Sequence, residues 1–352
     1  MTVHIALDAM GGDQGPDVLV AGAVLAVNSR PDLEVTLLGD ETALRRSLQN
    51  HAQRQDERLH IVHTSEVITM DDSPFEAVRK KKDASVVVAF DLQKRGKVEA
   101  VVSAGNSGAT LAAAMRSLGR LKNIARPGIA GIFPTLKGPV VMMDVGANVD
   151  CRPQHLLQFG VMAAAFSRVL FGNDRPRIGL LSIGEEGGKG NILVKKSHEL
   201  LSQSTLNYIG NVEGRDTFQG DVDVIVCDGF VGNVCLKLSE GLAEAVLAML
   251  REEISKNFKS KVGYMLAKDA FASFRKRVDY AEYGGAPLLG LDGTGIVCHG
   301  RSNAVAIKNA ILVAAELVCK KVNDHILRLL AEADVVPATP AGDDAAMAGG
   351  SS

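Results

Sequence analysis

Glycine-rich turns that also carry polar side chains follow several short apolar runs of this sequence. Backbone amides beside glycines are exposed, and amides at the start of a helix attract anions such as phosphate. Loops that follow parallel strands emerge at one edge of a sheet, so we expect five of these turns to line one polar cleft. The turns are Asp8–Asp13, Ser103–Gly108, Asp144–Asn148, Gly184–Asn191 and Asp228–Asn233.

Lys189 is the residue of these turns best suited to binding an anion. Its ammonium group is a full charge on a flexible stem, and flanking glycines leave it without a local partner. Neutral donors are expected to accompany it, although an asparagine taken alone is more typical of a helix cap or a turn. The candidate catalytic residues are Lys189, Asn191, Asn233 and His299. The candidate substrate- or phosphate-binding residues are Asp8, Gly11, Gly12, Asp13, Ser103, Gly105, Asn106, Ser107, Gly108, Asp144, Asn148 and Asp228.

Three common glycine-loop motifs are not matched. The first turn, DAMGGD, lacks the G-x-G-x-x-G fingerprint of dinucleotide-binding proteins. The segment Gly187–Gly190 resembles the end of a Walker A loop, but its spacing is wrong and glycine replaces the final Ser or Thr. Gly105–Gly108 lacks the spacing of a nucleophile elbow. The remaining interpretation is a site for an anion and a carbonyl group.

Composition narrows the function classes. The 352 residues have a formal net charge of −2, which gives no support to nucleic-acid binding. The five cysteines show no metal-ligand spacing with histidine or with each other, so we expect no metal site, and we expect no cofactor. Cys227 is predicted to be a small buried hydrophobic residue. The sequence starts without a signal-peptide pattern and holds no apolar run long enough for a membrane span, which predicts a cytoplasmic protein.

Strand-like runs alternate with segments of helical periodicity, which predicts an α/β fold with a doubly wound, mainly parallel sheet. The short link 134–139 predicts a local antiparallel hairpin between two of the strands. The predicted strands are Val3–Leu7, Glu34–Leu38, Leu59–Val62, Glu99–Val102, Gly128–Phe133, Val140–Met143, Arg177–Leu181, Leu206–Ile209 and Val222–Cys227. The predicted helices are Asp17–Val27, Thr42–Gln49, Ser85–Lys94, Gly108–Leu118, Pro153–Leu170, Ile192–Leu201, Glu240–Ser255 and Asn303–Leu329.

A basic amphipathic arm is expected at about residues 254–278, as two short helices, because Gly263 disfavours a single straight one. Its polar faces are almost purely cationic, which fits an anionic membrane surface or an acidic protein partner. A solvated helix face is the ordinary alternative. The contact residues are Lys256, Phe258, Lys259, Lys261, Met265, Leu266, Lys268, Phe271, Phe274, Arg275, Lys276 and Arg277, and a second basic cluster is Arg79–Lys82. Residues 1–332 are expected to form one two-lobed catalytic unit and residues 333–352 a disordered tail.

Several of these segments, in this order, resemble signatures of the bacterial phosphate acyltransferases, which make acyl-phosphate from acyl-acyl carrier protein and inorganic phosphate. The resemblance covers nearly the whole chain, from Ile5 to about Leu330. It implies the fold of isopropylmalate dehydrogenases and phosphotransacetylases, a homodimer, and a role in phospholipid synthesis at the inner face of the membrane. It also implies acyl carrier protein, inorganic phosphate and a membrane glycerol-3-phosphate acyltransferase as partners. The segments are Asp8–Asp13, Ser103–Ala109, Asp144–Asp150, Gly210–Asp216, Asp228–Val234 and Tyr283–Gly290.

The implied reaction is direct attack of a phosphate oxygen on a thioester carbonyl, with expulsion of a thiolate. Phosphate is already an anion and a thiolate leaves readily, so neither a protein nucleophile nor a metal is required. We assign phosphate and the developing charge to Lys189, with Asn191 and Asn233 as co-donors. Asp8, Asp13 and Asp144 are expected to orient donors. His299 is expected either to protonate the leaving sulfur or to be structural.

Three alternatives remain open from the sequence. One is a phosphotransacetylase-like enzyme that uses acyl-coenzyme A, which a donor-swap assay would distinguish. Another is a nicotinamide-dependent dehydrogenase of similar architecture, which would have to bind NAD without a dinucleotide fingerprint. The third is a non-enzymatic module that binds acyl lipid or phosphate at the membrane and would release no carrier protein.

Overall fold

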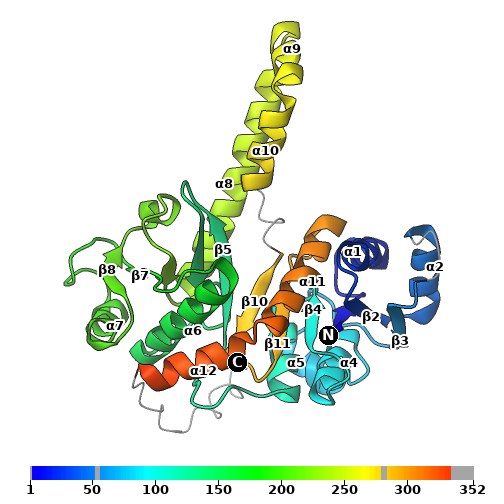
Figure 1. Ribbon diagram of the computed structural model, residues 1–352, viewed down its shortest axis with the longest axis horizontal. Coiled ribbons are helices and arrows are strands. Elements are labelled where there is room, and N and C mark those ends of the chain that lie inside the picture. Colours follow the sequence, from blue (N-terminus) through cyan, green and yellow to red (C-terminus); the bar gives the residue numbers. More distant parts are fainter. Residues whose placement is uncertain (1, 52–55, 279–283, 334–352) are drawn as a thin grey trace.

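A single eleven-stranded sheet runs through the molecule, in the order β3-β2-β1-β4-β11-β10-β5-β6-β9-β7-β8 (Figure 1). This computed structural model describes residues 2–51, 56–278 and 284–333, with the side chains of 275–278 excepted. The strands are β1 Val3–Asp8, β2 Leu33–Gly39, β3 Leu59–His63, β4 Ala100–Ser103, β5 Gly128–Pro134, β6 Pro139–Met143, β7 Ile178–Leu181, β8 Tyr208–Val212, β9 Val224–Val226, β10 Ala286–Leu289 and β11 Thr294–Val297.

Helices cover both faces of the sheet, each over its own apolar core. The α1, α6, α11 and α12 side chains form one core with one face of the strands, and α3, α4 and α5 form the other. The helices are α1 Pro16–Ser29, α2 Glu41–His51, α3 Pro74–Lys80, α4 Ser85–Lys94, α5 Ser107–Ser117, α6 Pro153–Phe171, α7 Ile192–Gln203, α8 Gly229–Ser255, α9 Phe258–Leu266, α10 Lys268–Val278, α11 Ala304–Cys319 and α12 Val322–Glu332, with the 3₁₀ turn η1 at Gly214–Phe218. The two-sided covering confirms the α/β, doubly wound prediction.

The strands reverse direction in the middle of the sheet, and this overturns the expectation of one edge for all five turns. The β1, β2, β3, β4 and β11 strands are parallel, whereas β10 is antiparallel to both β11 and β5. The β5 strand in turn forms the predicted antiparallel hairpin with β6, and β7, β8 and β9 follow the direction of β6. The turns after β1 and β4 therefore leave the sheet at the opposite edge from those after β6, β7 and β9.

Most predicted elements are present, and the differences have local causes. Each predicted strand forms, but β10, β11 and α3 were not predicted. The α8 helix begins at Gly229 instead of Glu240, because Asp228 caps it by accepting from the Val231 amide at 2.9 Å. The predicted helix 303–329 is two helices, because Lys321 takes a left-handed conformation with φ 50°.

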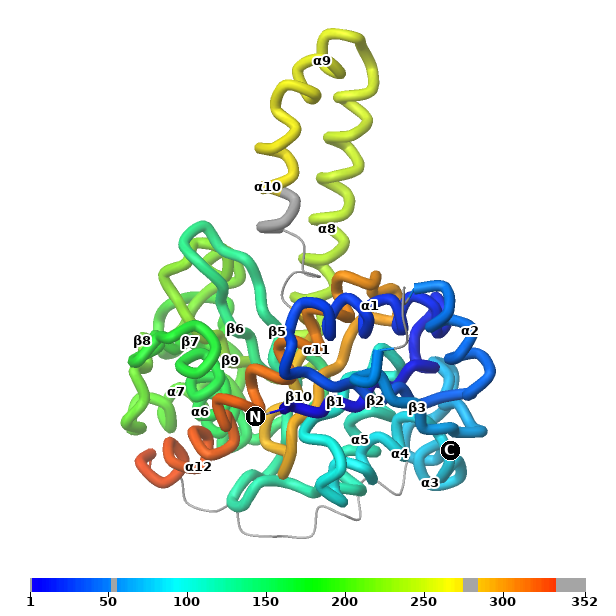
Figure 2. Tube along the Cα trace, turned by 45° about the vertical axis from the view of Figure 1, so that its right-hand side comes forward, coloured from blue at the N-terminus to red at the C-terminus, as the bar shows by residue number. Residues whose placement is uncertain are grey.

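A helical arm projects far from the body (Figure 2), and it is longer than the predicted 254–278 because it begins with α8 at Gly229. Its ascending limb is α8, whose 27 residues make a helix about 40 Å long. The α9 and α10 helices return beside it, and the rings of Tyr264 and Phe271 lie 4.9 Å apart across their junction. The helix is interrupted at Ala267, between α9 and α10, and not at Gly263, which lies inside α9. In the described part of the chain, no helix has the length and apolar character needed to cross a bilayer.

Candidate active site

Asp8, at the end of β1, organises the first group of predicted site residues. It is buried, and its carboxylate accepts hydrogen bonds from Ser85 Oγ at 2.6 Å and Ser103 Oγ at 2.7 Å. Burial raises the pKa of Asp8 against the opposing effect of these hydrogen bonds. Ser103, at the end of β4, accepts in turn from the Gly105 amide at 3.1 Å. Asp8 therefore ties the turn after β1 to the turn after β4.

The two turns meet through their glycines. A Cβ atom at Gly11 would lie 2.6 Å from Asp8 Oδ2 and 2.7 Å from the Gly105 nitrogen, closer than real Cβ contacts. Only glycine fits at this position, so the two turns approach each other backbone to backbone. Gly12 and Gly108 are partly exposed beside this contact, and Ser107 and Asp13 are exposed. The arrangement presents backbone ahead of the first turns of α1 and α5.

Asn106 has a structural role at the start of α5. Its Oδ1 caps the helix by accepting from the Ala109 amide at 3.1 Å, and its Nδ2 donates to the carbonyl oxygens of Met70 and Asp72, each at 3.2 Å. Pro74 of α3 lies against Gly108, where an added Cβ would be 2.9 Å from Pro74 Cγ. The segment around α3 is thus fixed to the turn after β4.

The turn after β11 joins this first group. The Asp13 amide donates to the Gly300 carbonyl at 2.9 Å, and a Cβ at Gly300 would lie 2.6 Å from Asp13 Oδ2. His299 is half-buried, and its Nδ1 accepts from the Arg301 amide at 3.1 Å. The structure therefore brings His299 to the loop of Asp13, through β11, which the strand predictions did not contain.

Asp144 organises a second group at the ends of β6 and β9. It is fully buried, and it accepts from the amides of Ile129, Gly146 and Ala147 and from both nitrogens of Asn148, at 2.7–3.1 Å. Burial raises the pKa of Asp144, and these hydrogen bonds oppose the rise. Asp144 holds the loop, which is the role proposed for it. Asn148, predicted as a substrate- or phosphate-binding residue, is buried and donates from Nδ2 to Asp144 and to the Pro127 carbonyl, each at 2.8 Å.

Asn233, the fifth residue of α8, lies over the second group. A Cβ at Gly146 would be 3.6 Å from Asn233 Oδ1, so the exposed amide side chain packs beside the glycine turn. Gly229 and Gly232 place α8 against the same turn, since an added Cβ would lie 2.7 Å from Asn148 O and 1.9 Å from Asp144 O respectively. Asn233 and the Asp144 turn thus share one surface at the base of the arm.

Lys189 lies in the long turn after β7, and β7 pairs with β9. Its side chain is exposed, and its stem lies over Gly184, where a Cβ would be 3.1 Å from Lys189 Cγ. Asn191 accepts from the Val194 amide at 2.9 Å and so caps α7. The Oδ1 atom of Asn191 is therefore engaged in a helix cap, the role that is more typical of a single asparagine than ligand binding.

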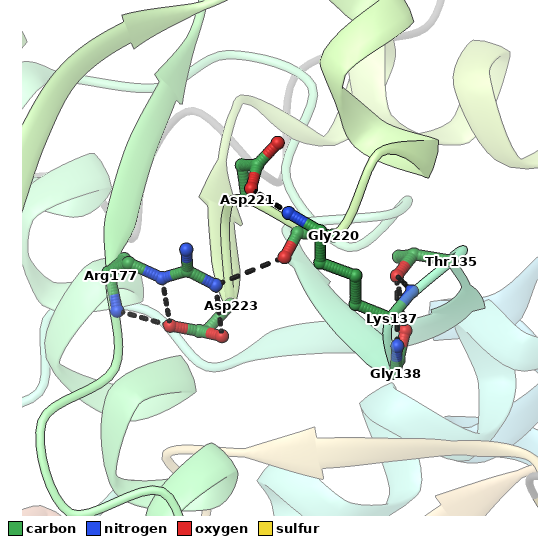
Figure 3. A network of polar contacts seen from close by, with 7 residues as sticks. All are labelled: Thr135, Lys137, Gly138, Arg177, Gly220, Asp221 and Asp223. Atoms are coloured by element: carbon green, nitrogen blue, oxygen red, sulfur yellow. Dashed lines mark hydrogen bonds and ion pairs between the residues drawn. The ribbon is translucent and has the colours of Figure 1, made fainter.

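A polar network fixes the β5–β6 hairpin to the starts of β7 and β9, on the far side of these strands from their turns (Figure 3). Arg177 binds Asp223 through Nε at 2.9 Å and Nη2 at 3.1 Å, and Nη2 also donates to Gly220 O at 3.1 Å. Lys137 pairs with Asp221. Burial would raise the pKa of Asp223, but the hydrogen bonds from Arg177 outweigh it and the pKa is lowered.

Other sequence expectations can be placed as well. Cys227 is buried, and burial raises its pKa, so it packs as a small hydrophobe. The arm exposes Phe258, Met265 and Leu266, and its Lys256 pairs with Glu253. Two parts of the prediction lie outside the described residues. These are the side chains of Arg275, Lys276 and Arg277 in the arm, and residues 334–352 of the expected tail. Three residues of the site were not predicted from the sequence: Ser85, Gly229 and Gly232. The two glycines lie in the turn Asp228–Asn233, which was predicted, whereas no motif in the sequence pointed to Ser85.

Solved structures with a similar fold include a phosphotransacetylase and a dehydrogenase. The EutD phosphotransacetylase from Staphylococcus aureus matches with a TM-score of 0.58 and 18% identity, covering 90% of this chain and 94% of that chain. A 4-hydroxythreonine-4-phosphate dehydrogenase from Klebsiella pneumoniae matches with a TM-score of 0.51 and 16% identity, covering 90% of this chain and 100% of that chain. At these identities the likeness shows the fold alone, and it confirms the predicted architecture.

The sequence comparisons are more specific. The family model described as "Fatty acid synthesis protein" matches residues 3–325. The phosphate acyltransferase of Syntrophotalea carbinolica is 55% identical over 328 residues, which are 93% of this chain and 94% of that protein. That of Geobacter sulfurreducens is 55% identical over 325 residues, which are 92% of this chain and 93% of that protein. The chain therefore belongs to the fatty acid synthesis protein family and, within it, to the phosphate acyltransferases.

Proposed function

We propose that this acyltransferase moves a fatty acyl group from acyl-acyl carrier protein to inorganic phosphate, giving acyl-phosphate for phospholipid synthesis. The observation that carries the proposal is the backbone contact of Gly11 with Gly105. It brings two glycine turns together ahead of the amino-terminal ends of α1 and α5, with the buried Asp8 carboxylate beside the contact. The partly exposed backbone at Gly12 and Gly108 and the two helix dipoles there suit a phosphate ion.

The reaction balances with the two substrates alone. A phosphate oxygen forms a bond to the thioester carbon, the carbon–sulfur bond breaks, and the thiolate takes up one proton. Holding phosphate beside the carbonyl can lower the barrier by roughly 7–11 kcal/mol. One donor to the tetrahedral oxyanion adds about 3–4 kcal/mol. Asp8 and Asp144, both buried in their own loops, orient these turns and do not exchange protons with the substrate.

Lys189 and Asn233 are the proposed donors from the second half of the sheet. Strands twist by about 20–25° each, so six steps from β1 to β9 turn the sheet through roughly 120–150°. Two strand groups that run oppositely in the sheet then point their carboxyl ends toward a common side. In both overviews α1 and α11 lie toward the end of the body from which the arm projects (Figures 1 and 2). This supports one site shared by the two groups, with His299 in the first group as donor to the leaving sulfur.

Lys189→Ala tests the mechanism, with Lys196→Ala as the matched control. Both lysines are exposed, and Lys196 lies on α7, outside the glycine turn 184–191. Acyl-phosphate formed from acyl-acyl carrier protein and phosphate is trapped with hydroxylamine and counted. We expect Lys189→Ala to lose most turnover while Lys196→Ala keeps it. Equal rates in the two variants would remove Lys189 from the mechanism, and acyl-coenzyme A as the better donor would favour the phosphotransacetylase-like alternative.

Acyl carrier protein is proposed to dock beside α3. A pocket of about 370 Å³ is lined by Phe75, Val78, Arg79, Lys82, Ala112 and Arg116 from α3, α5 and the segment after α3. Within the basic cluster, Lys80 and Lys81 pair with Glu76 and Asp72, whereas Arg79 and Lys82 are exposed at the pocket. A basic rim around an apolar ring fits an acidic helix. Since Pro74 contacts Gly108, the pocket adjoins the phosphate turns.

Charge reversal at Arg79 and Lys82 separates docking from chemistry. Arg79→Glu with Lys82→Glu is expected to raise KM for acyl-acyl carrier protein and leave kcat nearly unchanged. The matched control is Lys122→Glu with Lys320→Glu, which reverses the same amount of charge outside the pocket lining. Equal KM values in the two double variants would place the carrier protein elsewhere.

The arm is proposed to hold the protein at the inner face of the cell membrane, near the membrane glycerol-3-phosphate acyltransferase that would take up the product. Its tip exposes Leu266 at 82% and Phe258 at 79% of their surface beside the lysines of α9. Apolar side chains can enter the lipid interface while lysines meet anionic headgroups. Binding to vesicles containing anionic lipid should fall with salt and in Leu266→Ser, with Leu327→Ser, an exposed leucine of α12, as the control.

A homodimer through α8 is proposed from the apolar stripe on that helix. Val234, Leu238, Leu242, Val246 and Met249 are all exposed and recur at helical spacing along one face. A second copy of the same helix can cover this stripe. We expect sedimentation to give a dimer for the wild type and a monomer for Leu238→Glu with Leu242→Glu; a dimer in both would place the interface elsewhere.

A further inference from the structure

Two histidines and a glutamate lie together at the beginning of the sheet, away from the glycine turns. His4, Glu34 and His60 come from β1, β2 and β3, which are adjacent parallel strands. Register pairs His4 with Glu34 and Thr36 with His60, so the four side chains share one face of the sheet. One ligand atom from each of His4, Glu34 and His60 lies within 4.8 Å of those of the other two.

Both imidazoles converge on one carboxylate oxygen. Glu34 Oε2 is 3.0 Å from His60 Nε2 and 4.0 Å from His4 Nδ1. An ordinary surface ion pair engages one histidine, whereas here a second ring nitrogen is aimed at the same atom. Ligand atoms around a tetrahedral zinc ion, each about 2.0–2.1 Å from the metal, are about 3.3 Å apart. Small side-chain rotations therefore convert this arrangement into three metal bonds.

The back of the cluster holds the ligands in place. His4 Nε2 is 2.7 Å from Thr36 Oγ1, which fixes the ring with Nδ1 toward Glu34. A metal-bound histidine ordinarily has such a partner on its other nitrogen. The backbone of His4 is also held, because its amide donates to Glu99 Oε2 at 2.7 Å. The side chains of His60 and Glu34 are 43% and 34% exposed, so an ion and its water can reach them.

We propose that His4, Glu34 and His60 bind one divalent transition-metal ion of the Zn²⁺ type, with water completing its coordination. Two imidazoles and one carboxylate suit zinc and its first-row neighbours. The ion joins three neighbouring strands at the β3 end of the sheet. His4 stands four residues before Asp8 on β1, about 13 Å away. The site is therefore structural and separate from the phosphate turns, and its three ligands from distant segments show no sequence spacing.

Zinc titration of the full chain tests the site. Chelator-treated protein is titrated with Zn²⁺ by calorimetry, and the melting temperature is followed with and without Zn²⁺. We expect one equivalent of binding and a Zn²⁺-dependent rise in melting temperature in the wild type, both lost in His60→Gln and Glu34→Gln. Thr36→Val should weaken binding by about tenfold. His51→Gln is the matched control, since its ring pairs with Asp17 at 2.8 Å outside the cluster, and it should bind as the wild type does.

The result that would overturn the proposal is equal Zn²⁺ stoichiometry and affinity in the wild type and His60→Gln, or no wild-type binding. Folding of each variant is checked by a cooperative melt in chelator, and the Zn²⁺-dependent rise in melting temperature is compared with that variant's own value in chelator. X-ray absorption at the zinc edge of the wild-type complex gives a readout that does not depend on any variant. Nitrogen and oxygen ligands with an imidazole signature support the site, whereas sulfur ligands would assign the ion to the free cysteines.

Discussion

Gly232, in the first turn of α8, packs directly against the backbone carbonyl of Asp144 at the end of β6, where an added Cβ would lie 1.9 Å from the oxygen. Gly232→Ala is therefore expected to lower the free energy of unfolding by about 3 kcal/mol. Gly241→Ala, on the same helix in open space, should raise it by up to about 1 kcal/mol through helix propensity. Urea denaturation of both variants measures the difference, and equal stabilities would contradict the close packing.

Gly11 is expected to be irreplaceable for activity. The Cβ of Gly11→Ala would meet Asp8 and Gly105 and push the first two turns apart by a fraction of an ångström or more. A displacement of about 1 Å at an active site can cost about 100-fold in rate, and kcat/KM for phosphate should fall by that order. Gly138→Ala, in open space at the tip of the β5–β6 hairpin, is the control. Similar kcat/KM values in the two variants would remove the turn contact from phosphate binding.

Because Asp8 is buried, we expect the protein to be more stable at mildly acidic pH, where this carboxyl is protonated, than at neutral pH, where it is charged. Its pKa is raised in the folded state, so its contribution to stability is fully present below the unfolded pKa and is lost as pH rises through the folded pKa. Asp8→Asn removes that loss. Its melting temperature should equal or exceed that of the wild type at pH 7, with a smaller change between pH 7 and about pH 4. A variant that melts lower than the wild type by the same amount at both pH values would be the opposite result.

The Arg177–Asp223 pair is expected to titrate in the other direction. The pKa of Asp223 is lowered in the folded state, so its contribution is present above the unfolded pKa of about 3.9 and disappears as pH falls through the folded value. Asp223→Asn should destabilise the protein at pH 7, and the deficit should shrink in acid. Asp221→Asn breaks only the exposed pair with Lys137, seen beside it in Figure 3, and should have a much smaller effect. A pH-independent deficit in Asp223→Asn would assign the effect to packing.

Much of the architecture could be predicted because local patterns determine it. Contiguous residues form the apolar runs of β1, β2 and β4 and the short link of the β5–β6 hairpin, so each can be recognised locally. The strands β10 and β11 were missed because Pro287 and Gly295 interrupt their short apolar runs, and their pairing with β4 and β5 joins segments more than 150 residues apart. The reversal of strand direction comes from the β5–β6 hairpin, because β10 is antiparallel to both of its neighbours and β5 therefore runs in the same direction as β4. The hairpin was predicted, but its effect on the direction of β6, β7 and β9 was not taken into account, and the five turns were expected at one edge.

The candidate site could be predicted by residue type but not by grouping. Asp8 and Asp144 were expected to orient donors, and the structure gives each a ring of amide or hydroxyl donors. Asn106 and Asn191 carry the same residue type and pattern as Asn233, yet both cap helices. From the sequence all three asparagines were expected between a strand and a helix, so a cap and a ligand donor had the same pattern, whereas in the structure Asn233 lies inside α8, whose cap is Asp228. Only the partners of the side chain distinguish them.

The place of β10 and β11 in the sheet has a consequence for how the newly made chain folds. These late strands fill the gap between β4 and β5, although both neighbours are translated long before them. Until residue 297 has left the ribosome, the first four strands and the five from β5 to β9 are two incomplete sheets, each with an unpaired edge facing the other. The nascent polypeptide must shield those edges through most of its synthesis, and a truncation ahead of residue 286 would leave them permanently open to aggregation.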